Sequence, residues 1–150
     1  MNSINVKNTI NFNKEIIFGE IGALIGAPLI SYIVSRFTSV IKFISFSAVI
    51  GGIIGGVLFW LFMRVYDKKI DKKFSIKNLA EDIIYFTPIA FLISLFMYYP
   101  LLFFFSEHFL ESQYKILYSV IFAQLIAFSF FLVMMNIYRY FLAKIYKKVL

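Results

Sequence analysis

The chain has 150 residues, of which 61% are hydrophobic and 20 are phenylalanine, and its mean hydropathy is +0.84. A soluble protein of this size cannot bury that much apolar surface, so the composition excludes a soluble fold and indicates an integral membrane protein. The formal net charge is +7, and the absence of cysteine excludes disulfide bonds and thiolate metal sites.

Four continuous apolar runs are long enough to cross a membrane as helices. Crossing about 30 Å of hydrocarbon takes roughly 20 helical residues, and only helices or closed barrels satisfy all backbone groups in lipid. The runs lack the alternating pattern of barrel strands. The sequence therefore predicts an all-α integral membrane protein, a four-transmembrane-helix bundle forming a single domain over residues 1–150, with spans near 16–34, 43–63, 83–105 and 116–138.

The first segment, residues 1–15, is polar and rich in asparagine. It lacks the charged-then-apolar order and the cleavage site of a signal peptide, so we expect the first span to stay in the mature protein. We expect this span to begin near Glu15. The loop 35–42 is short, which predicts that the first two helices are antiparallel neighbours.

All seven glycines lie in the first two spans: Gly19, Gly22, Gly26, Gly51, Gly52, Gly55 and Gly56. A glycine costs a soluble helix about 1 kcal/mol relative to alanine, whereas in lipid small residues allow helices to approach closely. In the second span they form two adjacent ladders, one with Gly51 and Gly55 and one with Gly52 and Gly56. We predict a helix-packing role for all seven. The alternative is that one ladder is a self-association face or lines a pathway.

Basic residues lie almost entirely on one predicted side of the membrane. Only three of the 15 Lys and Arg residues fall on the other side, namely Arg36, Lys42 and Lys115. The rest lie in the first segment, in the connection 64–82 and in the tail 139–150. The positive-inside rule then predicts that both termini and this connection are cytoplasmic, in a multi-pass protein of the cell membrane. We expect these segments to contact anionic lipid headgroups rather than nucleic acid.

The third predicted helix contains no glycine. Thr87, Ala90, Ser94 and Tyr98 share one face of it, which we assign to the bundle interior. Its many Phe, Leu and Ile residues suit lipid or a partner subunit.

The two halves of the chain show a weak similarity. Glu15–Phe18 and Asp82–Tyr85 open the first and third helices, whereas Met63–Tyr66 and Met135–Tyr138 close the second and fourth. This similarity raises the hypothesis of two 2-helix repeats in the same orientation.

Glu20 is the only acidic residue well inside an apolar run. An ionised carboxylate in hydrocarbon is costly, so intramembrane acids usually mark function. The alternative is that Glu20, one turn after Glu15, lies near the headgroups at the positive end of its helix. With Ser31 on the same side and Gln124 in the fourth span, Glu20 makes a candidate intramembrane polar site. The default role of Gln124 is an interhelical hydrogen bond.

Glu107, His108 and Glu111 follow the third span and are expected in an outer loop. A catalytic metal normally needs three protein ligands with an ordered second shell, so one histidine with two carboxylates is a weak candidate. We predict a solvated polar loop, no metal and no other cofactor. The sequence has no Gly-rich phosphate loop, Ser/His/Asp arrangement or HExxH motif, and this favours a protein that is not an enzyme.

Two hypotheses of function come first. One is a non-catalytic structural or accessory subunit that packs against other membrane subunits or itself, because the soluble segments are short and the small-residue faces suit packing. The alternative is a small homo-oligomeric transporter, flippase or channel that uses Glu20 and the glycine-lined groove. A membrane enzyme that acts on a lipid headgroup with Glu20, Asn136 and Arg139 ranks third.

The charge distribution generates a prediction about topology. Cysteines introduced at Lys72 and at Ser112 should react with a membrane-impermeant maleimide from opposite sides of a sealed vesicle, because one predicted span, 83–105, separates them. Labelling of both positions from the same side would contradict the four-span arrangement.

Overall fold

The computed structural model describes residues 6–70 and 88–145, all of them in helices or in the turns between helices. The helices are α1 (Val6–Val34), α2 (Ile41–Ile70), the π-helix η1 (Ser94–Tyr98), α4 (Tyr99–Glu111) and α5 (Ile116–Ile145). Residues 88–93 are helical and continue into η1 and α4, so they belong to one third helix.

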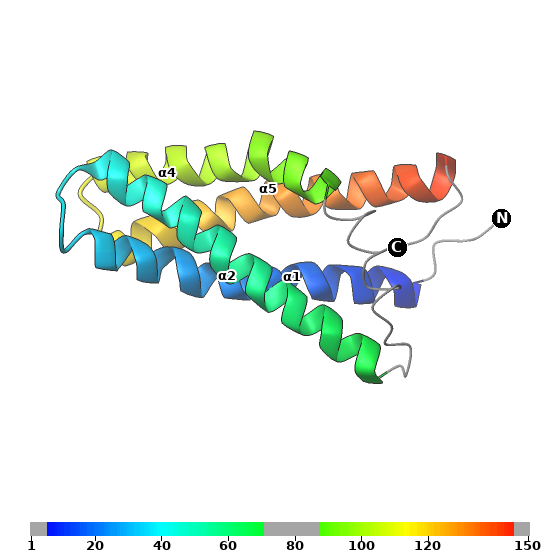
Figure 1. Ribbon diagram of the computed structural model, residues 1–150. Helices are drawn as coiled ribbons and strands as arrows, with labels where there is room; N and C mark the ends of the chain where they lie inside the picture. The colour runs from blue at the N-terminus through cyan, green and yellow to red at the C-terminus, as the bar shows by residue number, and fades with distance from the viewer. Residues whose placement is uncertain (1–5, 71–87, 146–150) are drawn as a thin grey trace.

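Four helices are long and apolar enough to cross a membrane: Asn13–Val34, Ile41–Tyr66, Pro88–Glu111 and Ile116–Phe141. They pack as a bundle in which both short turns lie at one end, whereas α1 begins and α5 ends at the other (Figure 1). We call the end at which α1 begins and α5 ends the terminal end. The predicted fold class, an all-helical membrane protein with four spans, is confirmed.

The predicted helix ends need correction, because hydropathy marks the apolar part of a helix and not the end of its backbone hydrogen bonds. The segment 1–15 is not a non-helical tail, since α1 begins at Val6. By contrast, α2 continues to Ile70 and α5 to Ile145, which agrees with the possibility, open from the sequence, that both helices run on into the basic segments after their spans. Residues 71–87, with Thr87 and the Asp82–Tyr85 part of the repeat hypothesis, lie outside the described residues.

The third helix also extends beyond its predicted end. Glu107, His108 and Glu111 were expected in a loop but lie in the last turns of α4, where the His108 ring stacks on Phe104. The turn to α5 is short because its backbone N–H groups bond to the last carbonyl oxygens of α4. Gln113 adopts a φ of 61°, and the N–H of Tyr114 donates to the carbonyl oxygen of Phe109 at 3.2 Å. This is the hydrogen-bond pattern of a Schellman motif, which directs α5 back along α4.

Backbone contact between α1 and α2 is the closest packing in the bundle. A Cβ atom built on Gly51 would lie 2.8 Å from the Cα of Ala27, and one on Gly55 would lie 2.7 Å from the carbonyl carbon of Gly22. One on Gly26 would overlap the backbone of Gly51. Real Cβ atoms do not approach backbone this closely. Gly22, Gly26, Gly51 and Gly55 therefore form the helix crossing, and we call these four the crossing glycines.

The other ladder of α2 packs more loosely. A Cβ on Gly52 would meet Leu102 at 3.6 Å, and one on Gly56 would meet Ala23 at 3.6 Å, both ordinary van der Waals distances. The fully buried Leu102 belongs to a core cluster with Ala123 and Ala127 of α5. The two small-residue ladders thus have different neighbours, although the sequence makes them look equivalent.

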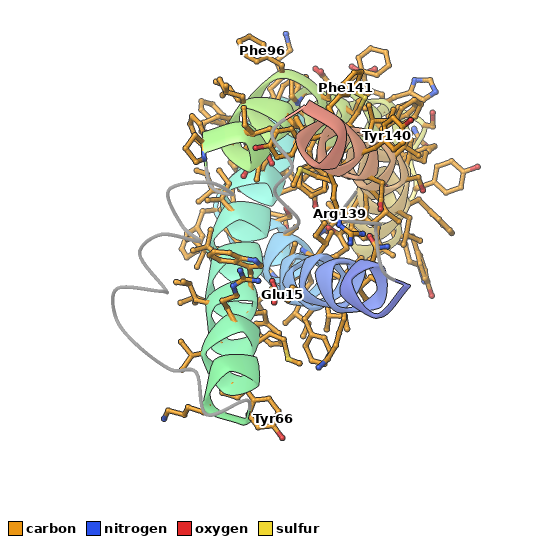
Figure 2. All side chains as sticks on the ribbon, turned by 90° about the vertical axis from the view of Figure 1, so that its right-hand side faces the viewer. Glu15, Tyr66, Phe96, Arg139, Tyr140 and Phe141 are labelled. Carbon is orange, nitrogen blue, oxygen red and sulfur yellow. The ribbon has the colours of Figure 1, made fainter. Side chains whose placement is uncertain are left out.

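Large apolar side chains cover the outside of the bundle. Phe96 of the third helix and Phe141 of α5 point away from the neighbouring helices, and Phe96 is 74% exposed (Figure 2). In water such a surface would be unstable, whereas lipid tails solvate it without cost.

The different packing of the ladders predicts different responses to a single methyl group. Gly26→Ala and Gly51→Ala should each destabilise the protein by about 1–3 kcal/mol, because the added carbon forces two backbones apart. Gly52→Ala should change stability little, since its Cβ fits. The measurement is SDS-induced or thermal unfolding of the purified protein. Equal tolerance at all three positions would contradict the crossing.

Candidate functional site

A wide turn in the third helix builds one wall of the site. Over Ser94–Tyr98 the backbone forms a π-helix, and the N–H of Tyr99 donates to the carbonyl oxygen of Ser94. The next residue, Pro100, has no N–H and cannot continue an α-helical hydrogen-bond ladder, so a wide turn here avoids a clash. Tyr98 is buried, and both Tyr98 and Tyr99 line the same cavity.

Three polar side chains from three helices meet inside the bundle. The hydroxyl of Tyr98 donates to Oε2 of Glu20 at 3.0 Å, and Nε2 of Gln124 donates to the Tyr98 oxygen at 3.2 Å. Glu20 is 7% exposed and Gln124 is 0% exposed. The chain of hydrogen bonds therefore runs from α5 through the third helix to α1, and we call it the Glu20 network.

The Glu20 network lies deep in the membrane-spanning part of the bundle. Tyr98 is about 15 Å along its helix from Pro88 and about 20 Å from Glu111. Glu20 itself lies about four turns after the start of α1 at Val6. The interpretation of Glu20 as a residue near the first turn of its helix is therefore wrong, because the helix begins earlier than its apolar part.

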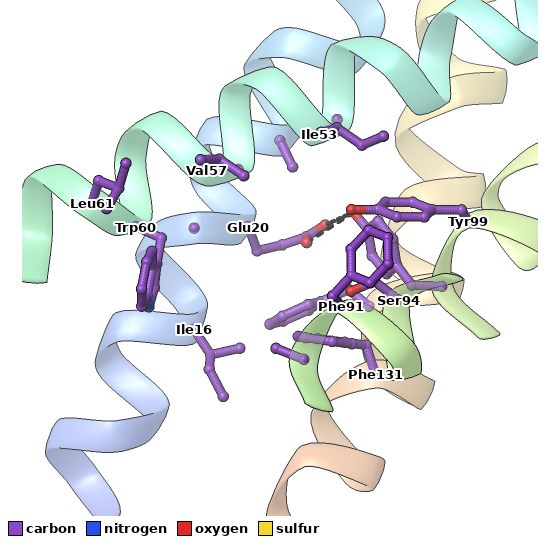
Figure 3. Close-up of a pocket in the computed structure, with 17 residues that line it drawn as sticks. Ile16, Glu20, Ile53, Val57, Trp60, Leu61, Phe91, Ser94, Tyr99 and Phe131 are labelled. Carbon is purple, nitrogen blue, oxygen red and sulfur yellow. Dashed lines mark hydrogen bonds between the residues drawn. The ribbon is translucent and has the colours of Figure 1, made fainter. Parts of the chain in front are cut away.

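A cavity of about 420 Å³ opens beside Glu20. Its walls come from α1, α2, the third helix and α5, and apart from Glu20, Ser94 and the rings of Trp60, Tyr98 and Tyr99 they are apolar (Figure 3). Val57 of α2 and Phe91 of the third helix line the cavity and are each about half exposed, so the cavity is not closed between these helices. The cavity thus opens sideways, between α2 and the third helix, toward the region that lipid occupies.

Three glycines contribute to this space: Gly19, Gly52 and Gly56 line the cavity. They are the glycines outside the helix crossing. Glycine therefore has two roles in α1 and α2, since the crossing glycines bring the backbones together and the other three leave room beside Glu20.

Ser31, the third member of the predicted polar site, belongs elsewhere. Its hydroxyl donates to the carbonyl oxygen of Ile44 at 3.3 Å, and the hydroxyl of Ser47 donates to the same oxygen at 2.7 Å. Ser31 lies about 16 Å along α1 from Glu20. The structure brings Glu20 and Gln124 together through Tyr98 and leaves Ser31 in a separate serine cluster between α1 and α2.

A second polar group links the helices nearer the terminal end. Glu15 of α1 forms an ion pair with Arg64 of α2, and Nδ2 of Asn136 in α5 donates to Oδ1 of Asn13 at 3.0 Å. The buried Arg139 lies on the inner side of α5, facing α1 (Figure 2). Asn13 is about 10 Å along α1 from Glu20, so Asn136 and Glu20 do not share one site.

The weak metal candidate does not gather further ligands. Glu107, His108 and Glu111 lie on α4, and no group of three His, Asp or Glu side chains able to hold a metal ion occurs in the part of the chain that the structure describes.

Sequence analysis missed Tyr98 as the partner of Glu20, and with it the aromatic cavity. The only signal was that Ala90, Ser94 and Tyr98 share a face assigned to the interior. Nothing in the sequence connects that face with Glu20, since the two residues are 78 positions apart.

Comparison with known protein families, with characterised proteins and with solved structures finds no match.

A double-mutant cycle tests the Glu20 network. Glu20→Met, which removes the acceptor oxygens at similar size, and Tyr98→Phe should be coupled in unfolding free energy by about 0.6–1.7 kcal/mol, the range of interhelical hydrogen bonds in membranes. The control pair, Glu20→Met with Ser31→Ala, should be additive within about 0.5 kcal/mol because these residues share no partner. SDS-induced unfolding of the five variants (three single and two double mutants) and the wild type measures both. Additivity in the first pair would contradict the hydrogen bond.

Proposed function

We propose that this protein is a small membrane transporter or flippase that binds an amphipathic molecule taken from the bilayer. The observation that carries the proposal is the cavity beside Glu20, which opens sideways in the membrane-spanning part of the bundle. A ligand with an apolar body and one polar group matches apolar walls with a single carboxylate at their inner side.

The size and lining of the cavity support this proposal over a purely structural role. Ligand sites are typically about 300–1,000 Å³, mostly apolar, with a few placed polar groups. A protein with a purely structural role would be more stable if side chains filled such a space, because a cavity loses dispersion contacts. Here Gly19, Gly52 and Gly56 leave the space open.

The accessory-subunit hypothesis remains the second candidate. It is favoured by the exposed phenylalanines of the third helix, Phe91, Phe96 and Phe104, which suit a membrane partner as well as lipid. A transporter of four helices would also need a neighbour, because a laterally open cavity encloses no pathway by itself. We propose a second copy of this chain as that neighbour.

Lipid translocation in proteoliposomes tests the transport proposal. The probe is a short-chain phosphatidylcholine with a fluorescent nitrobenzoxadiazole group on its acyl chain, and dithionite destroys the fluorescence of the outer leaflet only. The wild-type protein should raise the fraction that becomes accessible to dithionite over that of protein-free liposomes. Ala90→Phe should abolish the increase, because Ala90 lines the cavity and a phenyl ring there fills it.

Leu92→Phe is the matched control, since it adds a ring two residues away at an exposed position on the same helix. It should translocate the probe as the wild type does. A wild-type protein that moves no probe, or an equal loss in both variants, would contradict the transport proposal and favour the accessory subunit.

A further inference from the structure

Among the described residues that line the cavity, one side chain is acidic. Glu20 is the acidic side chain of its lining, and its hydrogen-bond partner Tyr98 is neutral. The nearby ion pair of the terminal end joins Glu15 to Arg64 and does not include Glu20. Of the residues that the structure describes, none that lines the cavity carries a positive charge.

An ionised carboxylate in an apolar site is costly unless a cation accompanies it. A ligand that brings the cation would supply this partner at the moment of binding. The attraction would be strong, because an ion pair out of water is little screened.

The remaining walls of the cavity also suit a cation. Trp60, Phe91, Tyr98, Tyr99 and Phe131 contribute aromatic rings to the lining (Figure 3). The face of an aromatic ring attracts a positive charge, with tryptophan the strongest, and the attraction grows when the cation has lost its water. The same rings offer apolar area to the uncharged body of the ligand.

We infer that the cavity binds a lipophilic cation, whose charged group pairs with the Glu20 carboxylate and whose apolar body packs on the surrounding aromatic rings. This inference depends on the proposed function, because it names the class of molecule that the laterally open cavity takes. An anion of the same shape would meet the carboxylate as a like charge, and a neutral molecule would bring no positive charge to pair with it.

Probes of one shape and different charge test the inference. Tetraphenylphosphonium is a cation and tetraphenylborate an anion of nearly the same shape, and triphenylphosphine oxide is a neutral relative. Trp60 is the only tryptophan of the chain and lines the cavity, so its fluorescence reports binding in lipid nanodiscs, with empty nanodiscs as the blank. Wild-type protein should bind the cation about tenfold or more tightly than the anion and the neutral probe.

Variants at Glu20 separate charge from shape. Glu20→Gln should lower the affinity for tetraphenylphosphonium by about tenfold or more and leave the neutral probe within about twofold. Glu20→Asp keeps the charge and should retain the preference for the cation. Glu107→Gln removes a carboxylate that does not line the cavity and should bind all three probes as the wild type does. Gel filtration and circular dichroism establish that each variant is folded.

The outcomes distinguish this inference from the function on which it depends. Equal affinity of the wild type for the three probes, with binding still lost in Ala90→Phe, would contradict the inferred preference for a cation. The cavity would still be a ligand site. Unchanged cation affinity in a folded Glu20→Gln variant would overturn it as well. Binding of none of the probes would contradict the inference and the proposed ligand site together.

Discussion

The architecture depends on backbone contact between α1 and α2 at the crossing glycines. In lipid, burying large apolar side chains between helices gains little, so close approach and good van der Waals fit must hold a helix pair together. Gly26 and Gly51 allow that approach because neither has a Cβ atom to keep the backbones apart. Once α2 is fixed across α1 in this way, it diverges from the third helix toward the terminal end (Figure 1). The cavity occupies the space between them.

Polar contacts then hold the remaining helices in register around this crossing. Buried polar groups in a membrane must find partners in the protein, because lipid offers none. Glu20 finds Tyr98, Tyr98 also binds Gln124, and the ion pair of Glu15 with Arg64 joins α1 and α2 again nearer the terminal end. The candidate site is thus part of what orients the helices, since its hydrogen bonds join α1, the third helix and α5.

The sequence predicts the four spans well because each follows from a long apolar run, a property of one segment alone. It predicts the helix ends poorly, because the backbone of α1 stays helical through polar residues from Val6. It also leaves open which glycine ladder brings its backbone against that of α1. Gly51 and Gly52 differ by one position on a helix, and only the placement of the neighbouring helices gives them different roles. Orientation in the membrane stays a prediction from charge.

The register of α4 was beyond prediction for a related reason. Helical periodicity assumes about 3.6 residues a turn, and the π-helix of Ser94–Tyr98 breaks that assumption in the middle of the third helix. Wheel diagrams drawn through it misplace every later residue. The interior face assigned to Ala90, Ser94 and Tyr98 comes before this break, but the sequence does not say which residue of another helix that face meets.

The wide turn at Ser94–Tyr98 also bears on how the length of this helix can change during evolution. Its hydrogen bond spans one residue more than that of an ordinary turn, so removing one residue within it would restore α-helical bonding and leave the later residues of α4 on the faces that they hold now. Leu102 would keep its contacts with α5. Only residues within the wide turn would change their places, so such a deletion would act on the wall of the candidate site and spare the core.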